Sequence, residues 1–168
     1  MIVISDTTPI ISLIKADKLD LLEKLYGKVL IPEAVFSELT DNLIYADESQ
    51  AVKNCSFLQV ENVNNTQSVQ LLRNVTGLDA GESEALILYQ EKNADLLLMD
   101  EHKGRGIAKK MSVEHIGTVG VLLYAFDKKY ITANEIEKIL SVLIDKNIRL
   151  SRSLCNKVLN YVGIKSKF

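Results

Sequence analysis

The chain has 168 residues, 47% of them hydrophobic, and a formal net charge of −2 at pH 7. This length suits one domain with a buried core, and no apolar run approaches the ~20 residues that a membrane-spanning helix requires. The first residues lack the basic region and cleavage site of a signal peptide, so we expect a cytoplasmic protein with no membrane partner.

Short apolar runs predict five strands, and each run is followed by a segment in which apolar residues have helical spacing. The strands are expected at Ile2–Ser5, Lys28–Ile31, Phe57–Val60, Asp95–Met99 and Ser112–His115. Strands that alternate with helices argue for a parallel sheet flanked by helices. The sequence therefore predicts an α/β fold.

Turn-forming and capping residues mark the helices. Thr8 is expected to cap the first helix, with Pro9 at the first helical position. Further helices are expected around Leu21–Tyr26, Glu33–Thr40, Val69–Val75, Glu82–Gln90, Thr132–Ile144 and Ser151–Tyr161. The helix from Glu82 is apolar on all sides across residues 85–89, which predicts burial against the sheet. No internal repeat, low-complexity stretch or linker divides the chain.

The cysteines and histidines form no recognisable pattern. Cys55 and Cys155 lack CxxC spacing, which argues against a disulfide framework or a zinc site. His102 and His115 lack the i, i+4 helical spacing of a zinc-binding pair. We therefore expect incidental thiols and no histidine-based metal site.

Four acidic residues are candidates for a divalent-metal site. Asp6 directly follows the first predicted strand and Asp100 the fourth, so the carboxyl edge of a parallel sheet would gather them. Glu38 and Glu82 would come from the intervening helices. Carboxylate oxygens suit Mg²⁺ or Mn²⁺, and several carboxylates held together repel one another unless a cation intervenes.

Three of the four acids also have a simpler explanation. Asp6 could cap a turn, Glu38 could be a solvated residue at the border of an apolar helix face, and Glu82 could complement a helix dipole. Asp79 and Glu84 compete with Glu82 for the role of third acid. These alternatives stay open at the level of the sequence.

A basic segment follows Asp100, which we prefer to Glu101 because it lies closer to the strand end. Residues 101–168 hold 13 Lys and Arg against 6 Asp and Glu, a net charge of +7, whereas residues 1–100 hold 7 against 16, a net charge of −9. The candidates for contact with RNA phosphates are Lys103, Arg105, Lys109 and Lys110. A solvent-exposed basic surface explains the same residues equally well.

These motifs resemble the PIN-domain family of metal-dependent ribonucleases, which includes the VapC toxins of toxin–antitoxin pairs. The resemblance is carried by Asp6-Thr7-Thr8-Pro9, by residues 31–39 with Glu38, by residues 82–87 and by Leu97-Leu98-Met99-Asp100. The order of all four motifs makes it specific. It implies a three-layer α/β/α fold with a central five-stranded parallel sheet in the order 3-2-1-4-5. Residues 1–128 would form the PIN-like domain, and residues 129–168 a helical extension packed on it.

The resemblance also implies a function, an endoribonuclease that requires Mg²⁺ or Mn²⁺ and acts as the toxin of a toxin–antitoxin pair. The implied catalytic and metal-binding residues are Asp6, Glu38, Glu82 and Asp100, with Thr7 and Thr118 orienting the carboxylates. Glu82 is preferred to Glu84 because it lies 18 residues before Asp100, a spacing similar to that of the family. The implied partners are RNA, a small antitoxin and a second copy of the chain.

Two other functions remain to be weighed. A PIN-like module that binds nucleic acid or protein without cutting is favoured by Glu82, which stands where an aspartate is common, and by the added C-terminal helices. A phosphatase of the haloacid-dehalogenase type would need a second acid two residues after Asp6. Position 8 is Thr8, so this chemistry is disfavoured.

Overall fold

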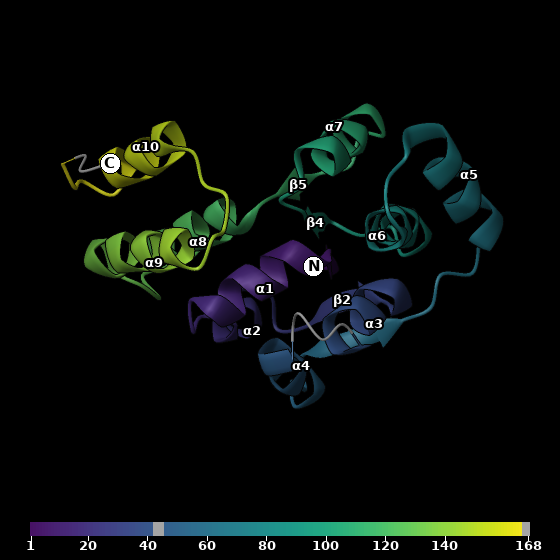
Figure 1. The fold of residues 1–168 in the computed structure, drawn as a ribbon, viewed down its shortest axis with the longest axis horizontal. Coiled ribbons are helices and arrows are strands. Elements are labelled where there is room, and N and C mark those ends of the chain that lie inside the picture. Colours follow the sequence, from purple (N-terminus) through teal and green to yellow (C-terminus); the bar gives the residue numbers. More distant parts are fainter. Residues whose placement is uncertain (42–45, 166–168) are drawn as a thin grey trace.

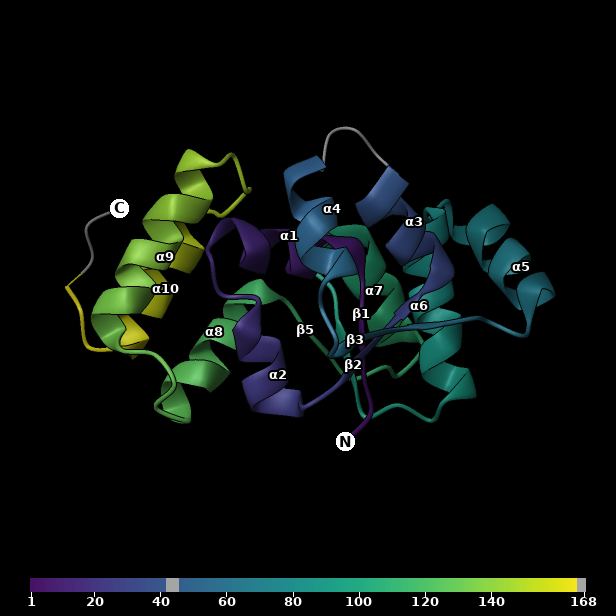
Figure 2. The same ribbon diagram turned by 90° about the horizontal axis from the view of Figure 1, so that it is seen from below.

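The computed structural model describes residues 1–41 and 46–165, and these form a five-stranded parallel sheet flanked by helices (Figures 1 and 2). The strands are β1 (Val3–Ser5), β2 (Val29–Pro32), β3 (Leu58–Glu61), β4 (Leu96–Leu98) and β5 (His115–Ile116). Their order in the sheet is β3-β2-β1-β4-β5, and every pair is parallel. The predicted α/β class, strand number and strand order are confirmed.

Helices connect the strands and continue after the last one. They are α1 (Thr7–Lys15), α2 (Asp20–Tyr26), α3 (Glu33–Asp41), α4 (Ala46–Lys53), α5 (Thr66–Thr76), α6 (Ala80–Glu91), α7 (His102–Lys110), α8 (Thr118–Asp127), α9 (Ala133–Asp145) and α10 (Arg152–Tyr161). Helices α4, α7 and α8 have no counterpart among the helices whose positions were expected from sequence. No helix in the described part of the chain is both long enough and apolar enough to cross a membrane.

The three central strands, β2, β1 and β4, are buried on both faces, which explains why they are almost continuously apolar. The edge strand β3 is only partly buried, and its Val60 is exposed. Successive side chains of a strand point to opposite faces, so Val3 and Leu98 join one core, together with helices α1, α8 and α9. Ile4 and Leu97 join the second core, which contains the apolar side chains of α6 and Ala108 of α7. The sheet is therefore the middle of three layers.

The first helix begins earlier than the sequence suggested. Asp6, not Thr8, is the N-cap residue, and Pro9 occupies the third helical position. A proline is tolerated there because the N–H groups of a first helical turn have no partner within the helix. The Asp6 side chain makes no capping hydrogen bond, so its carboxylate remains available at the end of β1.

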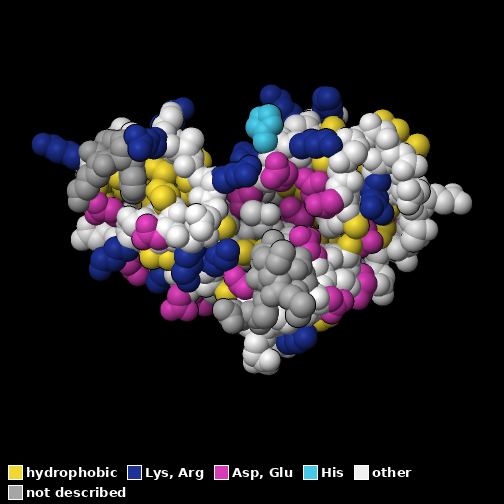
Figure 3. Space-filling model, in the orientation of Figure 1, with side chains coloured by type: hydrophobic (Ala, Val, Ile, Leu, Met, Phe, Trp, Pro, Cys, Tyr) yellow, Lys and Arg dark blue, Asp and Glu magenta, His cyan; other side chains and the backbone are white. Residues whose placement is uncertain are grey.

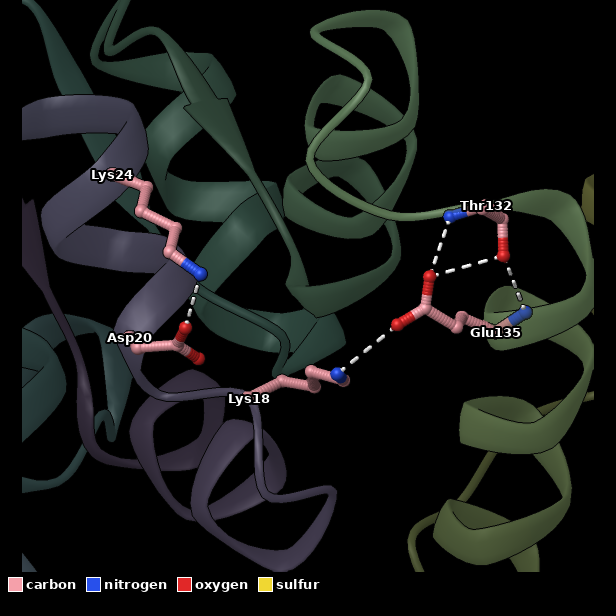
Figure 4. A network of polar contacts seen from close by, with 5 residues as sticks. All are labelled: Lys18, Asp20, Lys24, Thr132 and Glu135. Carbon is pink, nitrogen blue, oxygen red and sulfur yellow. Dashed lines mark hydrogen bonds and ion pairs between the residues drawn. The ribbon is translucent and has the colours of Figure 1, made fainter.

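The C-terminal helices form a lobe beside the sheet, and the surface is hollowed between this lobe and α7 (Figure 3). Buried residues of α9, among them Ile136 and Leu140, pack into the first core. Polar contacts fix the start of α9, where Lys18 Nζ lies 3.4 Å from Glu135 Oε1 (Figure 4). At the other end of α9, the Lys146 ammonium donates to the Lys15 carbonyl at 2.9 Å. The lobe is thus held at both ends of α9.

The cap of α9 should matter more to stability than the ion pair next to it. Thr132 and Glu135 form a capping box, in which each side chain accepts from the other residue's backbone N–H. Thr132→Ala is expected to lower the free energy of unfolding by about 1 kcal/mol. Lys18→Gln should lower it by less than about 0.5 kcal/mol, because exposed ion pairs contribute little. Urea unfolding of both variants measures the difference, and an equal loss would contradict this ranking.

Candidate functional site

The ends of the two central strands lie side by side at the carboxyl edge of the sheet. Strands β1 and β4 pair in parallel, with Ser5 opposite Leu98. The Asp6 N–H donates to the Leu98 carbonyl at 2.9 Å, so the chain following β1 stays beside the chain following β4. This arrangement places Asp6 and the start of the Asp100 segment at one edge, where parallel sheets bind their ligands.

Asp6 and Glu38 meet at Gly81, the second residue of α6. A Cβ atom placed on Gly81 would lie 3.5 Å from Asp6 Oδ1 and 3.5 Å from Glu38 Oε2. The Thr7 hydroxyl donates to Glu38 Oε2 at 2.7 Å and fixes that carboxylate. The absent side chain at position 81 therefore leaves the space in which both carboxylates converge.

Glu82 follows Gly81 in the first turn of α6, and its Oε1 lies 2.9 Å from the position of a Cβ atom on Gly104 of α7. Helix α6 begins two residues earlier than expected, because Asp79 is its N-cap. Glu82 Oε2 accepts from the Asp79 N–H at 3.0 Å, and the Glu82 N–H donates to Asp79 Oδ1 at 2.8 Å. The second oxygen, Oε1, is buried without a hydrogen-bond partner. The helix cap thus holds one oxygen of Glu82 and leaves the other one bare.

Glu84, the rival for the third acid, points elsewhere. Its Oε2 accepts from the backbone N–H of Ala34 at 2.9 Å, in the first turn of α3. A carboxylate is stabilised there because the N–H groups of a helix start lack partners within the helix. Glu84 therefore joins α6 to α3, whereas Glu82 carries the unpaired oxygen.

The electrostatics of Asp6 reflect this crowding of acids. Burial raises the pKa of Asp6 to about 8, and the nearby carboxylates of Asp79, Glu82 and Glu38 contribute to the rise, while the Thr7 backbone N–H partly offsets it. Burial also raises the pKa of Glu82. Like charges close together in a poorly solvated site favour protonation unless a cation neutralises them.

Oxygen donors of this kind fit a hard divalent cation such as Mg²⁺ or Mn²⁺. The bare oxygen of Glu82 is the observation that favours this fit, since a buried carboxylate oxygen without a donor is costly. Among residues 1–41 and 46–165, no three His, Cys, Asp or Glu side chains are grouped so that they would hold a metal ion. The site would therefore have to draw its acids together on binding.

Asp100 is directed toward the start of α8. Its two oxygens accept from the Thr118 N–H at 2.7 Å and from the Thr118 hydroxyl at 2.5 Å, and Oδ1 presses against Gly117. Burial raises the pKa of Asp100, and the Thr118 hydrogen bonds and Arg105 oppose that rise. Thr7 and Thr118 thus each donate a hydrogen bond to one of the predicted carboxylates.

The basic residues proposed for RNA contact all lie on α7 and are exposed. The Lys103 ammonium donates to the Gly77 carbonyl at 2.6 Å, just past the end of α5. Arg105 and Lys109 line a surface depression with Asp100, and Lys110 lies in the last turn of α7. In the face shown in Figure 3, Lys and Arg side chains border a central group of Asp and Glu.

Three glycines belong to the site although they were not among the site residues predicted from the sequence. Gly81, Gly104 and Gly117 each leave space that a site carboxylate fills, at Asp6 and Glu38, at Glu82 and at Asp100 respectively. The available signal was their position, because each lies close to the start of a helix. Asn147 and Arg149, which line a cleft together with Asp100, had no local signal.

Comparison with known proteins agrees with this architecture. A family model described as a PIN domain matches residues 2–163, and so runs from β1 through α10. No curated protein matches the chain at a significant level. Because the match covers nearly the whole sequence and the sheet has the expected strand order, the chain belongs to the PIN-domain family.

Proposed function

We propose that this PIN-domain protein is a divalent-metal-dependent endoribonuclease that hydrolyses phosphodiester bonds in RNA. The observation that carries the proposal is the convergence of Asp6 and Glu38 at Gly81. The next residue, Glu82, has a buried oxygen without a hydrogen-bond partner, which faces Gly104 of α7. Asp100, at the end of the neighbouring strand, completes the proposed set of acids.

The roles of the side chains follow from their contacts. A bound Mg²⁺ or Mn²⁺ would supply a Lewis acid and a water of lowered pKa, as hydrolysis of a phosphodiester near neutral pH requires. Asp6, Glu38, Glu82 and Asp100 would hold it. Thr7 keeps Glu38 turned toward Asp6, and Thr118 fixes both oxygens of Asp100. Arg105 and Lys109 would contact phosphates of the RNA.

The family to which the chain belongs supports a further proposal, that the protein is the toxin of a toxin–antitoxin pair. A small antitoxin would then cover the acidic edge of the sheet, and the active form would be a homodimer. A short reading frame beside the gene, whose product binds this protein and blocks RNA cleavage, would support the toxin role. Cleavage without such a partner would restrict the proposal to the nuclease.

The third acid can be identified with a matched pair of variants. We expect the protein to cleave RNA with Mg²⁺ or Mn²⁺ and not in EDTA. Glu82→Gln should lower the rate by about 10- to 100-fold, the range seen when groups that support a metal site are changed. Glu84→Gln should keep the rate, because the amide oxygen of the new side chain can still accept from the Ala34 N–H. An equal loss in both variants would contradict the assignment of Glu82.

A PIN-like module that binds without cutting is the second candidate. It is favoured by the absence, within the described residues, of three acids already grouped around one metal position. Calorimetric titration with Mn²⁺ separates the two functions. Stoichiometric binding that disappears in Glu82→Gln supports the nuclease, whereas no binding at millimolar Mn²⁺ together with no RNA cleavage supports the module.

A further inference from the structure

A cleft of about 530 Å³ opens beside Asp100, between the start of α8 and the chain that joins α9 to α10. We propose that this cleft binds one nucleotide of a single-stranded RNA substrate, next to the bond that is cut, and selects the sequence at that position. The inference rests on the proposed function, because it takes its occupant from that function. It assigns a role to the C-terminal helices, which the acidic site does not use.

The size and walls of the cleft suit a nucleotide. Its volume lies within the range of about 300–1,000 Å³ that is usual for small-ligand sites. Val119 and Leu123 of α8 line it together with Ile148 and Leu150 of the α9–α10 connection. Such aliphatic walls can cover the faces of a base, while Asn147, also in the lining, has an amide that can both donate to and accept from the base edge.

Two arginines of the cleft offer contacts to a phosphate-bearing ligand, beside the acidic residues Asp100 and Glu101, which also line it. Arg105 of α7 and Arg149 of the α9–α10 connection both line it, and both are exposed. Within the described residues, neither guanidinium forms an ion pair with a carboxylate. At the N-terminus of α8, the Thr118 N–H already donates to Asp100 and is not free to bind a phosphate. The two arginines are therefore the groups that would bind the phosphates.

The far wall of the cleft is held in place before any ligand binds. Leu143, which lines the cleft, is fully buried in the core, and Lys146 is bonded to the Lys15 carbonyl. The start of α9 is fixed by the contacts of Glu135 with Thr132 and Lys18 (Figure 4). A preorganised wall reduces the ordering cost of binding and can discriminate between bases.

The test measures RNA binding without turnover. A fluorescein-labelled single-stranded oligoribonucleotide is titrated with the full chain in EDTA, and its anisotropy is followed. Arg149→Ala is expected to weaken binding about 5- to 10-fold and to reduce the slope of log affinity against log salt by about 1, because one phosphate contact is lost. Arg152→Ala is the matched control, since Arg152 is also exposed but lies outside the cleft. It should bind like the parent.

A second variant tests the apolar wall. Leu154 lines the cleft and is 38% exposed, and it occupies the third position of α10, whose cap is Ser151. Leu154→Glu creates the Ser-x-x-Glu pattern of a capping box, so α10 should persist while a negative charge enters the cleft. RNA binding is expected to weaken about 10-fold or more, because the new carboxylate repels the phosphates. Leu71→Glu, at an exposed leucine of α5, is the control and should bind like the parent.

The outcomes separate this inference from the proposed function. The proposed role of the cleft is contradicted if Arg149→Ala and Leu154→Glu both bind RNA like the parent, or if the controls weaken binding equally. This holds even if the parent cleaves RNA. If the parent binds RNA but does not cleave it with Mg²⁺ or Mn²⁺, and both cleft variants bind RNA more weakly, the role of the cleft is supported and the nuclease function is contradicted. A parent that binds no RNA overturns the cleft as an RNA site and points to a protein occupant.

Discussion

Asp6→Asn is expected to lower the rate of RNA cleavage by at least about 100-fold and, at the same time, to stabilise the metal-free protein against unfolding. The loss of activity follows from removing a charged oxygen from the proposed metal site. The gain in stability, about 0.5–2 kcal/mol, follows because the variant no longer buries a carboxylate beside Glu38 and Glu82. Opposite effects on activity and stability would mark Asp6 as a functional residue.

The gain in stability of Asp6→Asn over the parent should increase with pH. Burial raises the pKa of Asp6 from 3.8 to about 8, so the folded state binds this proton more tightly than the unfolded state. The resulting contribution to stability is fully present below pH 3.8 and is lost as the pH rises through 8. The amide of Asp6→Asn does not titrate, so the advantage of the variant should grow over this range and be largest above pH 8.

Thermal unfolding in EDTA across this pH range measures the effect, and added Mn²⁺ should then raise the melting temperature of the parent more than that of the variant. Asp95→Asn is a suitable control, because Asp95 is exposed at the opposite end of β4, where it accepts from the Ile2 N–H. It should keep full activity. An Asp6→Asn protein that cleaves RNA normally would remove Asp6 from the site, and one that is less stable than the parent above pH 8 would contradict the electrostatic explanation.

Gly104→Ala is expected to destabilise the protein by about 1–3 kcal/mol, although alanine usually favours a helix. A Cβ atom at this position of α7 would lie 2.5 Å from Met99 Sδ and 2.9 Å from Glu82 Oε1. Met99 is fully buried, so the helix must shift or the core must repack. Because the clash also involves Glu82, Mn²⁺ binding should weaken as well.

Gly106→Ala provides the comparison within the same helix. Nothing lies within 4 Å of a Cβ atom at Gly106. The free energy of unfolding of this variant should therefore rise by up to about 1 kcal/mol, because alanine has a better helix propensity than glycine. Guanidinium unfolding of the two variants, with Mn²⁺ titration by calorimetry, measures both effects. Equal stabilisation in both variants would show that α7 can move away from Met99 without cost.

The parts of the structure that the sequence predicted well are those governed by local pattern. Apolar runs located all five strands to within three residues, although the fifth, Ser112–His115, overlaps the observed β5 only at His115. The position of Asp6 and Asp100 after paired strands follows from the geometry of a parallel sheet. Gly77 ends α5 in the left-handed conformation, at φ 65°, as expected of a glycine that closes a helix.

The remaining features depend on contacts between distant residues. The start of α6 could not be located because Asp79 and Glu82 are both good residues for a helix start, and only the capping box assigns their roles. Likewise, Thr8-Pro9 is an acceptable local cap, but the hydrogen bond from Asp6 to Leu98 ends β1 and starts α1 two residues earlier. The direction of Asp100 is set by Thr118, 18 residues further on.

The strand order has a consequence for how this protein is made. The middle strand, β1, pairs with β2 on one side and with β4 on the other, and β4 is about 90 residues further along the chain. Pairing across such a separation is slow, because a long loop must close first. A nascent or truncated chain that stops before Asp100 has the first acids but not the segment that completes the edge. Under the proposed function, such an incomplete chain lacks one of the acids of the metal site and should not cleave RNA.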